Sequence, residues 1–370
     1  MSWPLVKLKD CCKVVGGATP KREVPGYWDT PDIPWVTPKD VSNLSSPVLE
    51  DAPEYISEAG FRGCSTSMLP KGSVLVTSRA PIGNIAIAGR DLCTNQGFKS
   101  LIPNVGVDGL YLYYCMKRSS ERLQALGNGA TFKEVSKKIV EDFVIPLPPL
   151  AEQKRIASIL DKADAIRRKR QQALQLTDDF LCAVFLDMFG DPNSNPKRAD
   201  ILPMTEVFHI KTGKLNSNAA IEGGKYPFFT CAKEIFAIDD YAFDQEALLL
   251  AGNNAQADYD VKYFEGRFNA YQRTYVLTLR DSGWSYPFYK FALQYQLSNL
   301  KRASKGSSTK YITMEIMDRT MLPVPSQGDQ RRFVEHFNRV KAVQTALLMQ
   351  AQNDENLFSA LSYKAFTGQL

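Results

Sequence analysis

The sequence predicts an α+β protein that contains the same unit twice, each unit being a mixed α/β domain followed by a long helix. Three observations predict this fold class. Residues 1–145 and 193–322 alternate short apolar runs with glycine and proline, which is typical of strand-rich mixed domains. Each of these stretches is followed by a helical segment that starts beside a cluster of prolines. The two helical segments overlay without a gap when the numbering is shifted by 177.

The first mixed domain is predicted to contain several short strands and one longer helix. Residues 73–77 (SVLVT) and 85–88 (IAIA) are apolar and lie beside glycine, so we expect them to be buried strands. Residues 110–126 follow a helical pattern, and the sequence Gly127-Asn128-Gly129 would end that helix.

The segment from Pro146 to Asp191 is predicted to be one long helix. It continues for roughly forty residues without glycine or proline until Gly190 and Pro192 stop the pattern. Glu152 lies in the first turn, where a negative charge favours the helix N-terminus. At about 1.5 Å per residue such a helix is about 55–60 Å long, so we expect it to act as a spacer.

The second half of the chain repeats this order. Residues 226–230 (YPFFT), 247–251 (ALLLA) and 274–279 (TYVLTL) are predicted strands, and residues 286–297 are a predicted helix. A second long helix is predicted from residue 326 to residue 366. The predicted division into first domain, central helix, second domain and C-terminal helix is 1–145, 146–192, 193–322 and 323–370.

The shift of 177 also relates individual residues of the two halves. Gln153 corresponds to Gln330 and, upstream of the helices, Lys133 corresponds to Lys310. Apolar positions along both helices follow the 4-3 spacing of a coiled coil, which is interrupted near Arg167. Because a globular domain lies between the helices in the chain, we expect the helices to pack antiparallel. The predicted seam residues are Ile156, Leu160, Leu181, Val184, Phe333, Phe337, Phe358 and Leu361.

The composition is that of a globular and mildly basic protein. Hydrophobic residues make up 44% of the chain and aromatic residues 11%, which supports globular cores. The chain has no run of about 18 apolar residues, so no membrane span is predicted. The N-terminus lacks the apolar core of a signal peptide, and we therefore expect a cytoplasmic location. The seven cysteines include no CxxC pair, which argues against a disulfide framework or a zinc site. The net charge of +5 permits a polyanionic partner without requiring one.

Motifs that would indicate catalysis are missing from the sequence. It contains no GxxxxGK[ST] phosphate loop, no GxSxG and no HExxH. The sequence Asn195-Pro196-Lys197 differs from the Asn-Pro-Pro-aromatic motif expected of a DNA methyltransferase. A binding protein is therefore the favoured interpretation. A chain that methylates or cuts DNA unaided, and a coiled-coil scaffold without nucleic acid, stay as alternatives.

Polar loops of the two domains carry side chains that suit nucleic-acid contact. Asn and Gln can form two hydrogen bonds with an adenine edge, and Arg can do so with guanine. The matched loops 127–133 (GNGATFK) and 305–310 (KGSSTK) are hydroxyl-rich and basic, as loops that contact phosphates often are. For any single residue an ordinary turn or strand-end cap is the alternative, but the occurrence in both copies favours binding. The predicted DNA-binding residues are Arg79, Asn84, Asn95, Gln96, Lys99, Lys133, Asn253, Asn254, Gln256, Gln272, Arg273, Lys305 and Lys310.

Several stretches resemble one protein family. Residues 146–164 (PLPPLAEQKRIASILDKAD) and 189–196 (FGDPNSNP) resemble the central conserved region of specificity subunits of type I restriction–modification enzymes. Residues 322–337 (LPVPSQGDQRRFVEHF) resemble the second conserved region, together with the final AFTGQL. Residues 69–88 (LPKGSVLVTSRAPIGNIAIA), followed by NQGF, resemble a target-recognition domain of that family. The resemblance covers the whole chain, although Ser326-Gln327-Gly328 departs from the Pro-Leu-Ala of the first copy.

The resemblance implies a non-catalytic subunit that binds double-stranded DNA. Each mixed domain would read one half of a split, asymmetric DNA sequence in the major groove, and the two helices would set the gap between the halves. Methyltransferase subunits carrying S-adenosylmethionine, and a restriction subunit that translocates DNA with ATP and Mg, would assemble with the chain, which would hold no cofactor or metal itself. The basic run Arg167-Arg168-Lys169-Arg170 would then lie on the solvent-exposed face of the helices or against a methyltransferase subunit.

Overall fold

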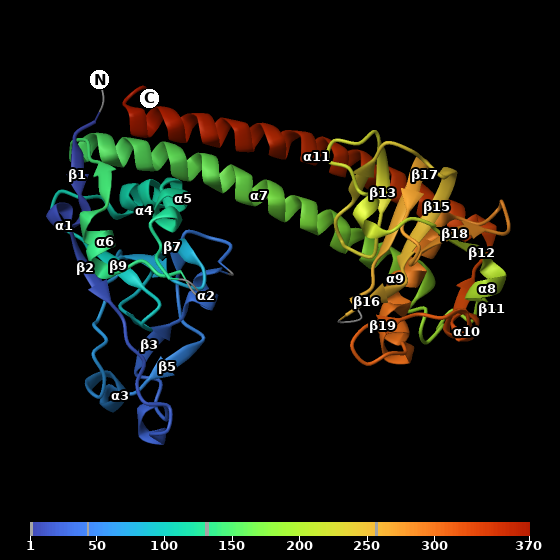
Figure 1. Ribbon diagram of the computed structural model, residues 1–370, viewed down its shortest axis with the longest axis horizontal. Helices are drawn as coiled ribbons and strands as arrows, with labels where there is room; N and C mark the ends of the chain where they lie inside the picture. Colours follow the sequence, from blue (N-terminus) through green and yellow to red (C-terminus); the bar gives the residue numbers. More distant parts are fainter. Residues whose placement is uncertain (1–2, 43, 130–132, 256–257) are drawn as a thin grey trace. The chain divides into compact units, whose positions relative to one another are not determined.

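The chain forms two compact units that share its two long helices, α7 (Leu150–Phe189) and α11 (Gln327–Thr367) (Figure 1). The computed structural model describes residues 3–42, 44–129, 133–255 and 258–370. Unit 1 consists of Met1–Gln172 with Met349–Leu370, and unit 2 consists of Ala173–Leu348. Each unit therefore contains one mixed domain and one part of each long helix. Across the described ranges, none of the helices has the length and apolar character needed to cross a membrane.

Unit 1 is built on a five-stranded sheet with the order β2-β9-β6-β7-β4. Its strands are β2 (Cys12–Gly16), β4 (Val48–Leu49), β6 (Val74–Ser78), β7 (Ile82–Ala88) and β9 (Lys99–Pro103). A smaller sheet contains β3 (Ile33–Val36), β5 (Glu54–Ile56) and β8 (Cys93–Thr94), and β1 (Leu5–Lys7) pairs with β10 (Val144–Pro146). The short helices are α1 (Leu8–Cys11), η1 (Pro25–Tyr27), α2 (Pro38–Ser42), α3 (Glu58–Arg62), α4 (Gly109–Arg118), α5 (Ser120–Ala125) and α6 (Lys137–Asp142).

The buried strand predicted at residues 73–77 is confirmed. It is the central strand β6, which begins and ends one residue later than predicted. All five of its residues are buried between β7 and β9, as expected for a continuous apolar run. The predicted helix at 110–126 is divided into α4 and α5. The Asp108 carboxylate caps α4 by accepting a hydrogen bond from Tyr111 N at 2.9 Å, and Tyr111–Met116 pack into the core.

Unit 2 is built on a six-stranded sheet with the order β12-β18-β15-β17-β13-β14. Its strands are β12 (Phe208–Thr212), β13 (Tyr226–Phe229), β14 (Phe236–Ile238), β15 (Phe243–Ala251), β17 (Val261–Ala270) and β18 (Thr274–Leu279). Two short pairs are β11 (Asp200–Pro203) with β20 (Met321–Val324), and β16 (Asn253–Asn254) with β19 (Lys310–Tyr311). The short helices are α8 (Met204–Val207), η2 (Ser217–Ala219), α9 (Tyr286–Ala303) and α10 (Met314–Arg319).

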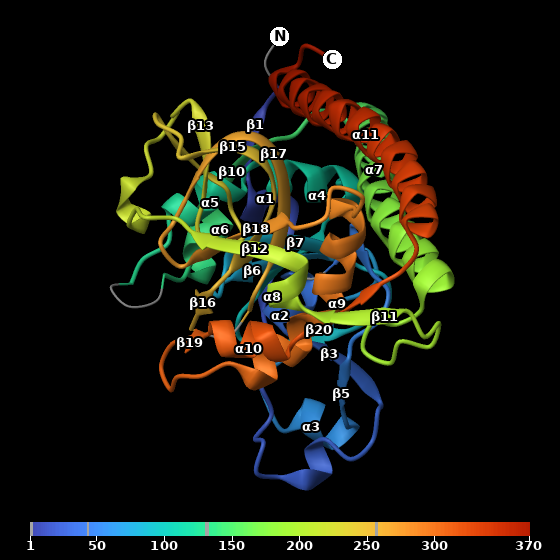
Figure 2. The ribbon, with the colours of Figure 1, turned by 90° about the vertical axis from the view of Figure 1, so that its right-hand side faces the viewer.

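Strand β17 was not among the predicted strands. Lys262, Glu265 and Arg267 interrupt its apolar residues, so the sequence alone shows neither a continuous apolar run nor a clean alternation. The strand forms because it pairs antiparallel with β15 from Val261 to Phe268. In the sheet it lies between β15 and β13, and it contacts the helix α9. Figure 2 shows this sheet and α9 from the side that lies on the right in Figure 1.

The repeat predicted from the sequence is present as repeated pairing in the two units. In unit 1 the edge pair β1–β10 sets Val6 opposite Ile145. In unit 2 the pair β11–β20 sets Leu202 opposite Leu322. Ile145 and Leu322 are related by the shift of 177. Their strands are also equivalent in the chain, because β10 leads into α7 and β20 leads into α11.

A buried glutamine attaches the start of α7 to the mixed domain of unit 1. Gln153 is 1% exposed. Its Oε1 accepts a hydrogen bond from Asp108 N at 2.9 Å, next to the start of α4, and its Nε2 donates to the carbonyls of Pro148 at 2.8 Å and Gly106 at 3.2 Å. Because buried polar groups are costly when unpaired, this side chain fixes where the helix begins relative to α4.

Unit 2 repeats this attachment at positions shifted by 177. Gln330 is also 1% exposed. Its Oε1 accepts a hydrogen bond from Ser285 N at 2.9 Å, and its Nε2 donates to the carbonyl of Pro325 at 3.0 Å. Ser285 caps α9 as Asp108 caps α4, so both long helices begin with the same hydrogen-bonded contact.

Within each unit the parts of α7 and α11 run antiparallel. In unit 1, Arg167 pairs with Glu355 at 2.8 Å and Arg170 with Asp354 at 3.3 Å, so the residue number falls along α11 as it rises along α7. The eight predicted seam residues all pack into apolar clusters. Ile156, Leu160, Phe358 and Leu361 pack in the cluster of unit 1, and Leu181, Val184, Phe333 and Phe337 in that of unit 2.

In unit 2 the antiparallel contact is partly aromatic. Phe185 and Phe333 have ring centroids 5.5 Å apart, and Gln344 of α11 donates to the hydroxyl of Thr177 at 2.8 Å. Both helices also pack on the domain, since Phe291 of α9 contacts Phe185 and Phe333 at 5.6 and 5.4 Å. The seam is therefore shared between the helices and the domain core.

The basic run at 167–170 does not form a solvent-exposed face as a whole, which corrects the first of its two predicted locations. Asp164, which is 3% exposed, accepts from Arg167 at 3.2 Å and from Arg168, and lies 3.4 Å from the Lys117 ammonium. Only Lys169 of the run is exposed. The polar interruption of the seam is thus filled with ion pairs, which the run alone could not reveal because two of the acids, Asp354 and Glu355, lie elsewhere in the chain.

The buried glutamines generate a prediction about stability. Gln153→Ala leaves one buried N–H and two carbonyls without their partner, so we expect a loss of about 1–3 kcal/mol in the free energy of unfolding. Gln330→Ala should cost a similar amount in unit 2. Urea unfolding followed by tryptophan fluorescence measures both, and Lys154→Ala, an exposed neighbour, is the control. Equal stability of Gln153→Ala and Lys154→Ala would contradict the anchoring role.

Asp164 generates a second prediction. Asp164→Asn leaves three cations facing an uncharged side chain. Because those cations are 26–39% exposed, we expect a loss on the order of 2–3 kcal/mol, below the value for a fully buried pair. Glu152→Gln removes an exposed pair with Arg155 and should cost less than about 0.5 kcal/mol. Urea midpoints compare the two, and a loss for Asp164→Asn no greater than that of Glu152→Gln would exclude a structural role for the cluster.

Candidate nucleic-acid interface

Three chain segments of unit 1 meet at the last residue of β6. Ser78 N donates to the carbonyl of Gly97 at 2.7 Å, and Ser78 O accepts from Val135 N at 3.0 Å. The end of β6, the turn before β9 and the segment after the loop 128–134 are therefore held together at one residue. We call this arrangement the loop junction of unit 1.

The predicted basic residues of this junction converge on one acid. The Glu134 carboxylate lies 3.7 Å from Arg79 Nη1 and 3.4 Å from Lys99 Nζ, and Lys99 also reaches the hydroxyl of Ser78 at 3.4 Å. Lys133, the neighbour of Glu134, is exposed. The side chains of Arg79 and Glu134 are 37% and 39% exposed, so solvent weakens the attraction and leaves both side chains accessible.

The predicted amide residues of unit 1 make local hydrogen bonds. Asn84 donates to the hydroxyl of Ser42 at 2.7 Å. The side-chain oxygen of Asn95 accepts from Gly97 N at 2.8 Å, which is the bond of an Asx turn. Asn95 thus fits its turn alternative, and its side-chain oxygen is used to shape the turn. Gln96 is exposed and accepts from the hydroxyl of Thr19.

Unit 2 contains the same junction at equivalent positions. Gly252 N donates to the carbonyl of Arg273 at 2.8 Å, and Gly252 O accepts from Ile312 N at 2.9 Å. The loop that follows is closed in the same way in both units. An antiparallel bridge joins Lys305 to Tyr311 in unit 2, and one joins residues 128 and 134, shifted by 177, in unit 1.

In each unit a glycine directly after a strand lets the chain pass close to the junction, Gly17 after β2 and Gly213 after β12. A Cβ on Gly17 would lie 2.2 Å from the carbonyl oxygen of Asn95, and a Cβ on Gly213 would lie 1.7 Å from that of Ala270. Both distances are too short for any other residue type without movement of the backbone. The contacts bring Thr19 to Gln96 in unit 1, and bring Asn216 to Gln272 in unit 2 at 2.7 Å.

The paired asparagines of unit 2 lie in a short strand and not in a flexible loop. Asn253 lies opposite Tyr311 and Asn254 opposite Lys310, in the pair β16–β19. Residues 305–310 were predicted to form a loop. The prediction is wrong for Lys310, which belongs to the strand β19 and pairs with Asn254 of β16. Gln256 lies outside the described residues.

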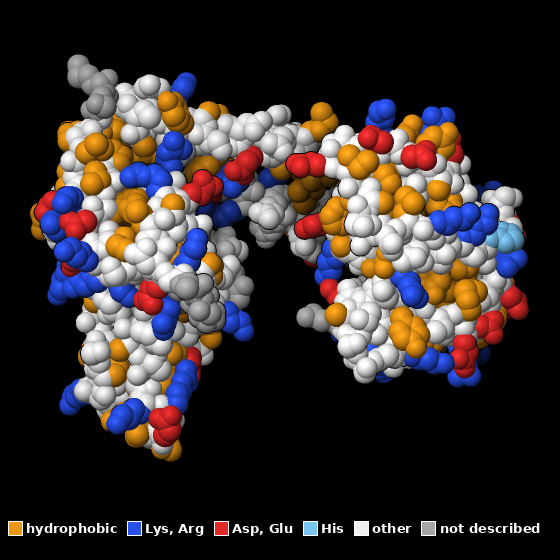
Figure 3. Space-filling model, viewed as in Figure 1, with side chains coloured by type: hydrophobic (Ala, Val, Ile, Leu, Met, Phe, Trp, Pro, Cys, Tyr) orange, Lys and Arg blue, Asp and Glu red, His pale blue; other side chains and the backbone are white. Residues whose placement is uncertain are grey.

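The cations of the unit 2 junction differ in their surroundings. Lys305 is exposed and pairs with Glu315 at 2.8 Å, which lowers the pKa of that carboxyl group. Arg273 is exposed and Lys310 is half-buried. Within the described part of the chain, no acid lies within ion-pair distance of Arg273 or Lys310. The face seen in Figure 3 shows Lys and Arg interspersed with Asp and Glu in each unit, without one uniform basic block.

Sequence reasoning missed two residues of the junctions, Glu134 and Tyr311. Glu134 is the acid on which Arg79 and Lys99 converge, and Tyr311 is 42% exposed beside Asn253. The two residues correspond under the shift of 177. The signal for both was therefore present in the repeat, although neither residue type stands out by itself.

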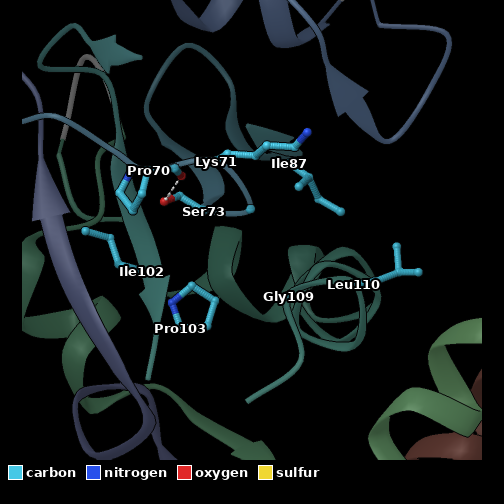
Figure 4. Close-up of a pocket in the computed structure, with 9 residues that line it drawn as sticks. Pro70, Lys71, Ser73, Ile87, Ile102, Pro103, Gly109 and Leu110 are labelled. Carbon is cyan, nitrogen blue, oxygen red and sulfur yellow. Dashed lines mark hydrogen bonds between the residues drawn. The ribbon is translucent and has the colours of Figure 1, made fainter. Parts of the chain in front are cut away.

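A pocket of unit 1 lies at the other end of β6 and is separate from the junction (Figure 4). Its lining residues are Pro70, Lys71, Gly72, Ser73, Ile87, Ile102, Pro103, Gly109 and Leu110. The Ser73 hydroxyl already donates to the carbonyl of Pro70 at 2.6 Å. Ser73 precedes β6 whereas Ser78 ends it, so this mostly apolar pocket does not extend the candidate interface.

Neither junction has the residues of a metal centre. Among the described residues, no group of three or more His, Cys, Asp or Glu side chains could hold a metal ion. The seven cysteines are free thiols, and Cys11, Cys12, Cys93 and Cys115 are buried. The chemistry that both junctions offer is thus hydrogen bonding and cationic charge.

Comparison with known proteins identifies the family. The chain is a two-domain protein in which the α+β unit occurs twice, each unit carries one loop junction, and two long helices run through both units. The family described as type I restriction modification DNA specificity domain matches residues 2–176 and 196–355, one stretch for each copy. The chain therefore belongs to this family.

Individual relatives agree in sequence and fold. The specificity subunit of the type I restriction enzyme MjaIX of Methanocaldococcus jannaschii is 27% identical over 367 residues, covering 90% of this chain and 85% of the relative. The EcoDI specificity subunit of Escherichia coli is 35% identical over 139 residues, covering 37% of this chain and 30% of the relative. The crystal structure of a type I restriction–modification S subunit from M. genitalium has the same fold, with a TM-score of 0.64 at 15% identity over 99% of this chain and 96% of that one.

Proposed function

We propose that this chain selects the DNA sequence on which a type I restriction–modification enzyme acts. The observation that carries the proposal is that the same loop junction occurs in both units and presents accessible cations and amides, with Gln96, Gln272 and Arg273 exposed and Arg79 half-buried. Amide and guanidinium groups discriminate base edges in the major groove, whereas ammonium groups bind phosphates. Membership of the specificity family supports DNA as the ligand.

Each unit would read one half of a bipartite, asymmetric target in this proposal. The recognition domains would be residues 1–145 and 193–322, and the two long helices at 146–192 and 323–370 would set the gap between the half-sites. The repeated attachment of Gln153 and Gln330 supports this, because it holds each helix to the domain that would read DNA. The 13 predicted contacts stay a proposal for the residues that approach the bases and phosphates.

The chain would supply sequence choice and no chemistry. Methyltransferase subunits would bind S-adenosylmethionine, extrude the target adenine from the duplex and methylate it, and a restriction subunit would use ATP and Mg to translocate DNA. The complex would act in the cytoplasm. The missing catalytic motifs support this division of labour.

Selection from a random duplex library by the assembled complex tests the function. We expect a bipartite sequence to be enriched, because two different junctions contact DNA at once. Replacing residues 193–322 with the matching segment of the MjaIX relative should change one half of the enriched sequence and leave the other. The single substitution Arg273→Gln should likewise change only that half of the enriched sequence. The control is Lys197→Gln, a substitution of an exposed residue of the same unit, which should leave both halves unchanged. Failure to enrich any sequence, or a change in both halves, would contradict the proposal.

A matched deletion tests the spacer. Removing residues 173–179 from α7 and 342–348 from α11 takes seven residues from each helix, which keeps the apolar seam on the same face. Each helix shortens by about 10 Å, so the gap in the enriched sequence should shrink by about three base pairs while the half-sites stay the same. Deleting three residues from each helix is the control, because it moves the seam off its face and should prevent assembly. An unchanged gap after the seven-residue deletion would exclude the ruler role.

A further inference from the structure

The backbone of unit 1 holds Glu134 at the base of a loop. Glu134 N donates to the carbonyl of Asn128 at 2.9 Å, and Asn128 N donates to that of Glu134 at 3.0 Å. The next residue, Val135, bonds to the end of β6. The carboxylate is therefore presented from an ordered bridge, and its two oxygens face different cations, Arg79 through Oε2 and Lys99 through Oε1.

The equivalent position in unit 2 carries no charge. Tyr311 occupies it, 42% exposed, and no acid pairs with Arg273 or Lys310 in the described residues. The two junctions thus share their backbone hydrogen bonds but differ in charge at this position. At unit 1, Arg79 and Lys99 share one acid, Glu134. At unit 2, among the described residues, Glu315 pairs with Lys305, and no acid pairs with Arg273 or Lys310.

We propose that Glu134 is a positioning residue that makes the first junction selective for bases over phosphates. The proposal rests on the function proposed above. A phosphate that binds Arg79 or Lys99 must compete with the carboxylate and approach it at close range, and like charges repel. Sequence-independent binding through these two cations is therefore weakened, which is a repulsive element against wrong DNA.

A base edge does not meet the same obstacle. Guanine presents neutral acceptors, O6 and N7, to an arginine. Arginine has five N–H donors in a planar fork, so Arg79 can keep Glu134 on Nη1 and still direct other donors at a base. Because the Arg79–Glu134 pair is 37–39% exposed, the carboxylate biases Arg79 without immobilising it, whereas the Lys99 side chain is only 15% exposed. Selectivity at this half-site then depends on Glu134 although Glu134 need not touch DNA.

The test uses the full-length chain and a fluorescent duplex of random sequence. With Glu134→Gln, both cations become free for phosphates, so affinity for this duplex should rise about 3–10-fold and the salt dependence of log K should steepen by about one to two. Glu141→Gln is the matched control. It removes the same charge from an acid of α6 whose ion pair is with Lys137 at 3.6 Å and not with Arg79 or Lys99, and it should change affinity less than about twofold.

Two further variants separate positioning from a general charge effect. Glu134→Asp keeps a carboxylate and should restore most of the wild-type salt dependence. In an Arg79→Gln, Lys99→Gln background, Glu134→Gln should have no further effect, because the cations that it neutralises are gone. The selection experiment adds a readout, since Glu134→Gln should relax base choice only in the half-site of unit 1.

The outcomes decide between the two proposals. If Glu134→Gln behaves like Glu141→Gln, or keeps its effect in the double-variant background, the positioning role is overturned while the bipartite selection by the wild-type chain stands. A wild-type chain that enriches no sequence overturns the proposed function and this inference together. If Glu134→Gln does not fold by circular dichroism, the Arg79→Gln, Lys99→Gln protein decides alone. It should keep most of its affinity for random duplex and lose base choice, and a large loss of random-duplex affinity would overturn the role.

Discussion

A buried amide side chain at the start of each long helix holds the rest of each unit in register. Gln153 and Gln330 are both 1% exposed, and each accepts a hydrogen bond from the backbone N–H of the residue that caps an earlier helix, α4 or α9. Rotating either long helix would leave buried N–H and carbonyl groups unpaired, which costs more than the hydrogen bond itself contributes. The loop junction lies only a short strand and helix upstream, because β10 and α6 separate it from α7. The surface proposed to bind DNA and the helix proposed to measure distance are therefore joined within each unit by a short stretch of helix and strand.

Features that depend on local pattern could be predicted from the sequence. The two long helices begin after prolines and end at Gly190 and Gly368, which both have the positive φ expected of a helix C-terminus. The apolar residues at the centre of β6 and β18, Val74–Val76 and Val276–Leu277, are buried as their composition predicts. The repeat was also visible, because the shift of 177 aligns chemistry as well as residue types. Ser136 caps α6 as Thr313 caps α10, and the two positions differ by that shift.

Features that depend on distant partners could not be predicted. Strand β17 carries charged residues, so its sequence pattern does not predict a strand, yet it forms a continuous antiparallel ladder with β15. The run at 167–170 reads as a basic surface because two of its acids, Asp354 and Glu355, come from the other end of the chain. Arg79 and Lys99 were found by residue type, but the acid between them was not. A carboxylate that lies near cations only after folding gives no signal in a single sequence, and here only the comparison of the two copies could have drawn attention to position 134.

The two junctions indicate how one scaffold can serve two different recognition surfaces. Backbone hydrogen bonds at Ser78 and Gly252, and the close approach of Gly17 and Gly213, are the same in both units and do not involve side-chain chemistry. Side chains around them are free to differ, since none of these bonds constrains what projects from the loops. The change from Glu134 to Tyr311 alters charge at one position while the bridge that holds it is kept. A fold maintained by main-chain contacts can therefore change its ligand preference by single substitutions, because function depends on the groups that the scaffold displays and not on the scaffold itself.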